Sequence, residues 1–258
     1  MSVVVPAYNE ERGIAQAVNE ARAWLDAHGR PYEIIVVDNA SVDLTVEALR
    51  PVLEDGRVRL LRNRTNRGKG YSVRRGMLDA RGGLRLHCDA DCTSSFTSLQ
   101  KMLDLLEQAD VVVGSRLAPG ASLGRRQPLG RRILGRSFVL LCRAVLREPT
   151  EDLFCGFKLW RGETAADVFT RLSLDGWVFD AESLALARAL GYRIRECGIQ
   201  WSDRAGSRLS PTRVLIPVVR DLLAARRHVR RQARAARASG VRPVGTEQLL
   251  PEPLDPAG

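Results

Sequence analysis

The stretch Glu33-Ile-Ile-Val-Val-Asp38 decides the fold class of this 258-residue chain. Consecutive β-branched residues bounded by carboxylates are typical of a central strand in a parallel sheet, which is buried on both faces. A second short apolar run at 3–6 comes before it, and residues 10–25 between the two carry apolar side chains with helical spacing. This order of strand, helix and strand predicts a βαβ unit.

The same alternation continues through the first half of the chain. Further predicted strands are 57–61, 84–88 and 110–114, and further predicted helices are 43–53, 68–81 and 96–108. We therefore expect an α/β protein with a doubly wound, mostly parallel sheet, and ligands at the carboxyl ends of its strands. Polar side chains follow those ends, as such a site requires: Asn9, Glu10, Asp38, Asn39, Asn66, Asp89, Asp91, Ser115 and Arg116.

Composition excludes several classes of protein. With 45% hydrophobic residues and no apolar run of about 20 residues, the chain is neither disordered nor a polytopic membrane protein. The first residues lack the basic and apolar regions of a signal peptide, so we expect a cytoplasmic protein. Five widely spaced cysteines without a CxxC pair indicate neither a disulfide framework nor a zinc knuckle.

The net charge of +10 is concentrated in two segments. Residues 111–147 contain eight arginines and no acidic residue, and residues 213–242 contain nine arginines against the single Asp221. Such segments favour a polyanionic partner, either a membrane surface or a nucleic acid. Aromatic side chains are not interleaved with the arginines as stacking platforms would require, so nucleic-acid binding is the weaker alternative.

Residues 131–146 form a cationic amphipathic helix if placed at helical spacing. Arg132 and Arg136 fall on one face, and Phe138 and Leu141 fall on the opposite one. This pattern suits a helix in a bilayer interface, at the inner face of the membrane, with Arg131, Arg132 and Arg136 meeting headgroup or acceptor phosphates. The alternative is an ordinary helix packed on the protein's own sheet with a solvated basic face.

We expect three segments in the chain as a whole. The predicted globular domain spans residues 1–212, and a second basic amphipathic helix spans 213–240. Residues 241–258 are rich in proline and polar residues, which predicts a disordered tail.

The run His87-Cys-Asp-Ala-Asp91 carries the strongest local signal for chemistry. Asp89 and Asp91 follow an apolar strand at the point where the chain turns, so both carboxylates can reach one divalent cation. Mg²⁺ and Mn²⁺ prefer such hard oxygen ligands beside substrate phosphates. The alternatives are solvated turn carboxylates or helix caps.

A second signal is Asn66-Arg-Gly-Lys-Gly70 at the start of a predicted helix. Its glycines allow close approach of a phosphate, the helix terminus offers free N–H groups, and Lys69 supplies a cation. The run is not a Walker A motif, because the first glycine is absent and Tyr71 stands where Ser or Thr would follow. A glycine-rich turn chosen for geometry alone is the alternative.

Taken together and in order, these motifs resemble a known family. They are Val3-Val-Val-Pro-Ala-Tyr-Asn-Glu10, Val36-Val-Asp-Asn-Ala-Ser-Val-Asp-Leu-Thr45, Asn66-Arg-Gly-Lys-Gly70, Asp89-Ala-Asp91 and Val113-Gly-Ser-Arg116. The set is similar to the inverting glycosyltransferases of family 2, which have the GT-A fold, a Rossmann-like and mostly parallel sheet flanked by helices. Three later runs look like the dolichyl-phosphate β-glucosyltransferase and dolichol-phosphate mannose synthase branch: Asp152-Leu-Phe-Cys-Gly-Phe-Lys158, Trp177-Val-Phe-Asp-Ala-Glu182 and Gly206-Ser-Arg-Leu209.

The resemblance implies a role for each matching residue. The nucleotide sugar would be held by Pro6, Ala7, Tyr8, Glu10, Asp38, Asn39, Lys69, Asp89, Ala90 and Asp91. Asp89 and Asp91 would bind Mg²⁺ or Mn²⁺, and the catalytic residues would be Asp180, Asp152, Arg116 and Lys158. The chain departs from the common pattern at Asn39, where a second aspartate is frequent, and at Ala40, where glycine is.

The resemblance also implies a reaction. A hexose, with glucose from UDP-glucose favoured, would pass with inversion to a polyprenyl or dolichyl phosphate. Such an acceptor has a second pKa of about 6, is largely ionised at pH 7, and needs no general base. The alternative acceptor is a soluble hydroxyl compound such as a natural product, which would need a base, and Asp180 and Asp152 are the residues proposed for it.

Overall fold

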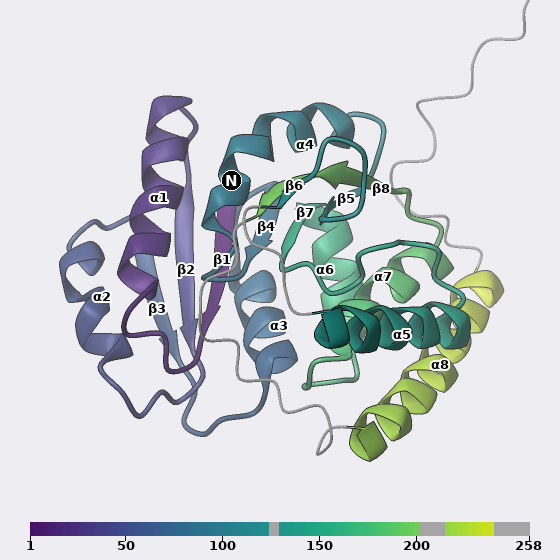
Figure 1. Ribbon diagram of the computed structural model, residues 1–258. Helices are drawn as coiled ribbons and strands as arrows, with labels where there is room; N and C mark the ends of the chain where they lie inside the picture. The colour runs from purple at the N-terminus through teal and green to yellow at the C-terminus, as the bar shows by residue number, and fades with distance from the viewer. Residues whose placement is uncertain (124–128, 202–214, 240–258) are drawn as a thin grey trace, which may run out of the picture.

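The computed structural model describes residues 1–123, 129–201 and 215–239. Its centre is a seven-stranded sheet with the strand order β3-β2-β1-β4-β7-β5-β8 (Figure 1). The strands are β1 (Ser2–Ala7), β2 (Glu33–Asp38), β3 (Val58–Arg62), β4 (Leu84–Cys88), β5 (Val111–Ser115), β7 (Phe157–Arg161) and β8 (Ile194–Gly198). A small second sheet pairs β6 (Ser122–Leu123) with β9 (Gln200–Trp201) in parallel.

Helices cover both faces of the large sheet, because its strands present apolar side chains alternately to either side. Val3, Val5 and Ile34 belong to the core on one face, whereas Val4 and Ile35 belong to the core on the other. The first face carries α1 (Ile14–Ala27), α2 (Thr45–Leu53), the 3₁₀ helix η1 (Thr93–Ser98) and α4 (Leu99–Leu106). The second carries α3 (Lys69–Asp79), α6 (Gly162–Arg171), α7 (Phe179–Ala189), α5 (Leu129–Leu146) and α8 (Leu215–Ala238). The predicted α/β class is confirmed.

The five strands predicted in the first half are present, but the large sheet also contains two strands that the sequence analysis did not predict, β7 and β8. The strand β7 lies antiparallel between β4 and β5, with Leu86 opposite Leu159 and Val112 opposite the same residue. Its residues 157–160 are all buried. Lys158 interrupts the apolar run, so the pattern of hydrophobic residues does not reveal this strand.

The two basic helices pack against each other and against α7 at one end of the molecule (Figure 1). Residues at helical spacing in α8, Val218, Leu222, Ala225 and Val229, are buried in the second core. In α5, Cys142 and Leu146 are buried in the same core. Phe138, on the apolar face predicted for a bilayer, packs against that core, so protein occupies part of this face. Leu141, predicted on that face, is nevertheless 42% exposed.

Some predictions fall on parts of the chain that lie outside the described residues. These are the 206–209 motif, the predicted tail at 241–258, and the side chains of Arg131 and Arg132, whose backbone belongs to α5. Within the described ranges, no helix is both long enough and apolar enough to cross a membrane.

Candidate active site

The predicted site residues gather at one edge of the large sheet. The strands β1, β2 and β4 are parallel, so their carboxyl ends share an edge, and the antiparallel β7 begins at that edge. Ala7 therefore lies beside Asp38, and Cys88 lies beside Phe157. This confirms that the residues following the strands form one neighbourhood, as expected at the carboxyl edge of such a sheet.

The turn after β1 is held rigidly by the loop after β2. Asn9 adopts a left-handed conformation with φ of 57°, and its N–H donates to Ser41 Oγ at 3.0 Å. The N–H of Val42 donates back to Asn9 Oδ1 at 3.0 Å, and the N–H of Glu10 donates to Thr45 Oγ1 at 2.8 Å. Tyr8, between β1 and these contacts, is 46% exposed and stands available to a ligand.

Asp38 and Asn39 are both buried at the end of β2, but they are engaged differently. Asp38 accepts hydrogen bonds from the N–H of Ser41 at 3.1 Å and from Nε of the exposed Arg62 at 3.3 Å. Asn39 Nδ2 donates to Asn66 Oδ1 at 2.9 Å, and Asn39 Oδ1 accepts from Asn63 at 2.9 Å. Asn39 therefore ties β2 to the loop before α3.

Ala40, where the family usually has glycine, has φ of 61°. This left-handed conformation costs a residue with a Cβ about 1–2 kcal/mol, and glycine is free of that cost. The departure from the family pattern therefore carries local strain.

Four charged groups from α3, β4, β7 and α7 form one buried cluster. Lys69 Nζ lies 2.7 Å from Asp89 Oδ2 and 3.5 Å from Asp180 Oδ2. Lys158 Nζ lies 2.5 Å from Asp180 Oδ1 and also donates to the carbonyl oxygen of Cys155 at 2.7 Å. Lys158 and Asp180 are each 1% exposed, so this pair is neutralised away from water, whereas the Lys69 and Asp89 side chains keep 13% and 22% exposure. This ion pair is the reason for a lysine inside β7.

The cluster shifts the pKa values of its members. Burial lowers the pKa of Lys69, but the charges of Asp89 and Asp180 outweigh burial and raise the pKa above its usual value. Burial raises the pKa of Asp89, but the charge of Lys69 and the hydrogen bond from His87 outweigh burial and lower the pKa well below its usual range. Partial loss of hydration beside the surrounding protein, together with the charge of Asp89, raises the pKa of Asp91 although its side chain reaches solvent. Asp89 is therefore a carboxylate at neutral pH.

His87 is a member of this cluster to which the sequence analysis gave no role. Its Nε2 lies 3.0 Å from Asp89 Oδ1, and its Nδ1 lies 3.9 Å from Asp180 Oδ1. Burial lowers the pKa of His87 more than the neighbouring carboxylates raise it. A signal for this contact exists in the sequence, because residues two apart on a strand share a face, and His87 precedes Asp89 by two.

Asp89 and Asp91, with the neighbouring Cys92, can hold a divalent cation. One ligand atom from each of the three residues lies within 4.8 Å of the others. Asp89 is fixed inside the cluster, whereas Asp91 is exposed and turned toward solvent. Two carboxylate donors fit Mg²⁺ or Mn²⁺, which leave further positions for substrate phosphates and water.

Gly156 explains how Asp89 fits beside β7. A Cβ on this residue would lie 1.9 Å from Asp89 Oδ2, so only glycine leaves room for the carboxylate. The N–H of Asp89 donates to the carbonyl oxygen of Gly156 at 2.7 Å.

Arg116 and Asp152 form a second pair. Asp152 is buried and accepts from the backbone N–H of Arg116 at 2.9 Å, from Nε at 2.8 Å and from Nη2 at 2.8 Å. Burial lowers the pKa of Arg116, but these bonds and the charge of Asp152 raise it above its usual value. The guanidinium lies 5.3 Å from the ring centre of Trp201. Asp152 thus orients Arg116.

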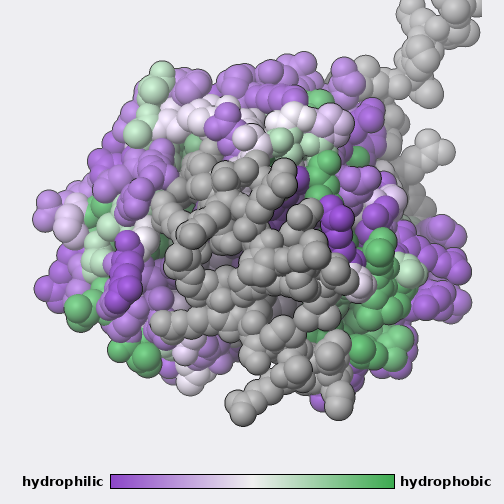
Figure 2. All heavy atoms as spheres, viewed as in Figure 1, coloured by the Kyte–Doolittle hydropathy of each residue, from purple (hydrophilic) through white to green (hydrophobic). Residues whose placement is uncertain are grey.

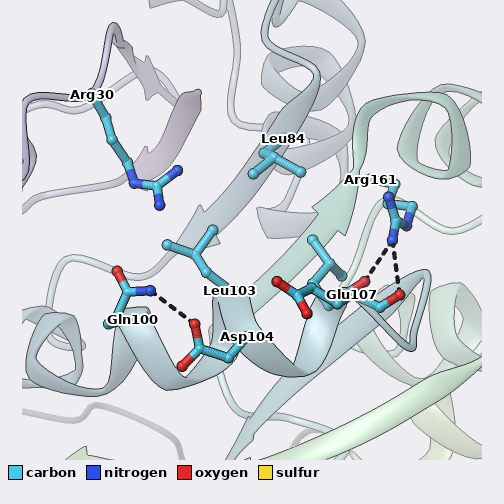
Figure 3. A pocket seen from close by; sticks show the side chains of 8 residues that line it. Arg30, Leu84, Gln100, Leu103, Asp104, Glu107 and Arg161 are labelled. Carbon is cyan, nitrogen blue, oxygen red and sulfur yellow. Dashed lines mark hydrogen bonds between the residues drawn. The ribbon is translucent and has the colours of Figure 1, made fainter.

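A hollow of about 280 Å³ lies at the opposite edge of the sheet (Figure 3). It is lined by Leu84, the first residue of β4, and by Arg161, the last residue of β7. Arg161 donates to the carbonyl oxygen of Leu106 at 2.6 Å, and Gln100 donates to Asp104 at 2.8 Å. This hollow is separate from the charged cluster.

Comparison with known proteins agrees with this arrangement. The family model for glycosyl transferase family 2 matches residues 2–169. The chain belongs to this family. It is therefore a glycosyltransferase, and the resemblance stated from its motifs is confirmed.

Several relatives of this chain are named dolichyl-phosphate beta-glucosyltransferase. A dolichyl-phosphate beta-glucosyltransferase of Dictyostelium discoideum is 33% identical over 238 residues, covering 86% of this chain and 72% of that protein. The Drosophila melanogaster protein of the same name is 36% identical over 237 residues, covering 86% and 73%.

Solved structures of other glycosyltransferases share the fold of this chain. Glucosyl-3-phosphoglycerate synthase from Mycobacterium tuberculosis, in complex with Mn²⁺ and UDP-glucose, matches with a TM-score of 0.59 and 18% identity, covering 86% of this chain and 78% of that one. S. aureus TarS in complex with UDP-GlcNAc matches with a TM-score of 0.56 and 18% identity, covering 90% and 70%. The GT-A fold predicted for this glycosyltransferase is therefore confirmed.

Proposed function

We propose that this glycosyltransferase moves glucose from UDP-glucose to a polyprenyl phosphate, with inversion at the anomeric carbon. The names of its family relatives support this choice of sugar and acceptor class. The chemistry of the cluster supports it independently, because the two carboxylates suggested as general bases are bound by cations.

The observation that carries the proposal is the burial of both carboxylates suggested as general bases. Asp180 is 1% exposed and lies between Lys158 and Lys69, and Asp152 is 3% exposed and bound by Arg116. A general base must come within hydrogen-bond reach of the proton that it removes. A phosphate monoester is largely ionised at pH 7, since its second pKa is about 6, and attacks without such a base. The arrangement therefore favours a phosphate acceptor over a hydroxyl acceptor.

Four residues of the site would bind the metal ion and stabilise the phosphate charges. Asp89 and Asp91 would hold Mg²⁺ or Mn²⁺, which when bound supplies Lewis-acid stabilisation to the departing diphosphate. Lys69 presents its ammonium between Asp89 and Asp180, so it stabilises negative charge that develops beside the metal ligands. Arg116, fixed by Asp152, offers a pre-oriented guanidinium to a phosphate.

Nucleotide release and lipid glycosylation, measured together, test the proposal. The purified protein is incubated with UDP-glucose, UDP-galactose, UDP-N-acetylglucosamine or GDP-mannose, with Mn²⁺ or EDTA, and with or without a short polyprenyl phosphate in detergent. We expect UDP-glucose to give metal-dependent UDP release that rises with the lipid phosphate, and a glucosylated lipid. Release that ignores the lipid would indicate a soluble acceptor, and no donor binding would overturn the proposal.

A matched pair of variants locates the reaction. Asp91→Ala removes the exposed carboxylate of the proposed metal site and should abolish release. Asp104→Ala removes a carboxylate on α4, where its only role in the described structure is to accept from Gln100. Asp104→Ala should leave release unchanged, and equal loss in both variants would contradict the assignment.

The surface formed by α5 and α8 is the part of the molecule suited to meet the membrane that holds such an acceptor. Leu140 and Leu141 on α5 are 59% and 42% exposed, and Val219 and Leu223 on α8 are 42% and 44% exposed. Figure 2 shows apolar atoms gathered over these helices, next to hydrophilic ones. Exposed arginines on the same helices include Arg136, Arg227, Arg230, Arg231, Arg234 and Arg237. Apolar side chains flanked by arginines fit an anionic lipid surface.

Flotation with vesicles of phosphatidylcholine containing an anionic lipid tests this contact. Replacing Leu140 and Leu141 by serine should reduce flotation, and Arg136→Glu should reduce it further at low salt. Leu78→Ser is the matched control, because Leu78 is similarly exposed, at 43%, but lies on α3 and not on α5 or α8. Unchanged flotation of the α5 variants would exclude α5 from the contact.

A further inference from the structure

We infer that His87 is a positioning residue that orients the Asp89 carboxylate for the divalent cation. This inference rests on the proposed metal site and adds to it a residue that hydrogen-bonds to one of the metal ligands. His87 opens the run that carries Asp89 and Asp91, but the sequence analysis gave it no role. The structure shows its contacts with Asp89, Asp180 and Phe179.

The geometry around Asp89 leaves its carboxylate a single orientation. His87 Nε2 lies 3.0 Å from Oδ1, and Lys69 Nζ lies 2.7 Å from Oδ2. Since a carboxylate only accepts hydrogen bonds, Nε2 carries the hydrogen that His87 donates. On the third side, Gly156 lies so close to the carboxylate that a Cβ there would collide with it.

The position of His87 is itself fixed by the sheet. It lies opposite Lys158 in the pairing of β4 with β7, and beside Val4 in the pairing with β1. Its ring lies 5.9 Å from that of Phe179 and is 1% exposed. A ring held by three strands and α7 cannot follow a displaced carboxylate, so it acts as a fixed donor.

Removing this donor alters the balance between Lys69 and a metal ion. Both attract the carboxylate of Asp89, and without a donor at Oδ1 only the ammonium at Oδ2 decides where the side chain points. Groups that hydrogen-bond to metal ligands typically change metal affinity about 10–100-fold when they are removed. The same loss is expected here for Mn²⁺.

Three substitutions separate the hydrogen bond from the volume of the ring. His87→Gln can place an amide N–H where Nε2 lies now. His87→Asn offers an amide only at the position of Nδ1, which is 3.9 Å from Asp180 and does not reach Asp89. His87→Leu fills the space without any donor.

The measurement is Mn²⁺ binding by isothermal titration in the presence of UDP, with UDP binding in EDTA and thermal unfolding recorded for each variant. We expect His87→Gln to stay within about 3-fold of the wild type, and His87→Asn and His87→Leu to lose about 10–100-fold in Mn²⁺ affinity. UDP binding in EDTA should change little in any of them. Should His87→Asn fail to fold, the comparison of Gln with Leu carries the same test.

Two results would overturn the inference, and they differ from failure of the proposed function. Wild-type Mn²⁺ affinity in His87→Leu would show that the hydrogen bond does not matter, and equal losses in all variants would show that only the ring shape matters. Absence of Mn²⁺ and UDP binding in the wild-type protein would instead overturn the proposed donor site, and the role of His87 with it.

Discussion

Replacing Gly156 by alanine should disable the site by displacing Asp89. The added methyl group would lie 1.9 Å from Asp89 Oδ2 and 2.0 Å from its Cγ, far inside contact distance. The carboxylate cannot move without loss, because Oδ1 is held by His87 and Oδ2 by Lys69. Nor can the backbone separate freely, because the N–H of Asp89 donates to the carbonyl oxygen of Gly156 at 2.7 Å.

The cost of Gly156→Ala follows from these contacts. Overpacking a rigid core costs about 1–3 kcal/mol. Losing the charged hydrogen bond from Lys69 to Asp89 costs about 1.5–3 kcal/mol more. In a chain of this size 1 kcal/mol corresponds to about 2–4 °C, so the melting temperature should fall by roughly 10 °C.

Thermal unfolding and Mn²⁺-dependent UDP binding, measured on the same preparations, check this prediction. Gly56→Ala is the matched control, because no atom lies within 4 Å of a Cβ at that position and its φ is not positive. We expect the control to keep the stability and binding of the wild type. A Gly156→Ala protein that melts and binds Mn²⁺ and UDP as the wild type does would refute the account of Asp89.

Three further changes probe other parts of the charge arrangement. Lys158→Met leaves Asp180 without its closest partner and should cost about 3–5 kcal/mol in urea unfolding, whereas adding Asp180→Asn should recover part of the loss. Glu33→Gln should lower the free energy of unfolding by about 2 kcal/mol at pH 7, since Glu33 accepts from Ser2 Oγ, the N–H of Arg81 and Arg59. Burial raises the pKa of Glu33, but these hydrogen bonds outweigh burial and lower the pKa. Their contribution to stability is therefore complete above the unfolded-state pKa of about 4.3. The difference in stability between the two proteins should vanish as the pH falls through the folded-state pKa of Glu33. Arg116→Lys keeps the charge but cannot donate both side-chain hydrogen bonds to Asp152, and it should destabilise the protein by about 1 kcal/mol in the same urea assay. An unchanged free energy of unfolding would contradict the bidentate contact.

Much of the fold was predictable because local patterns and global packing agree in the first half of the chain. The run at 33–38 is β-branched because both of its faces are buried, and the helices after each strand show the spacing of one buried face. The strand β7 escaped prediction because it contains a lysine, Lys158, which is buried for its ion pair with Asp180 and not for apolar packing. Burial of Lys158 depends on its ion pair with Asp180, which lies on α7, 22 residues further along the chain.

For the candidate site too, some features were predictable from local sequence and others were not. The sequence by itself determined that Asp38, Asp89 and Asp91 follow strands, and that parallel strands bring them to one edge, because side-chain type and strand direction are local properties. Only the tertiary structure decided which charges neutralise each other, that His87 and Gly156 confine Asp89, and that Asp152 orients Arg116 by accepting its hydrogen bonds. Those pairings join residues from distant segments, and their strength depends on burial, which arises when the helices close over the sheet.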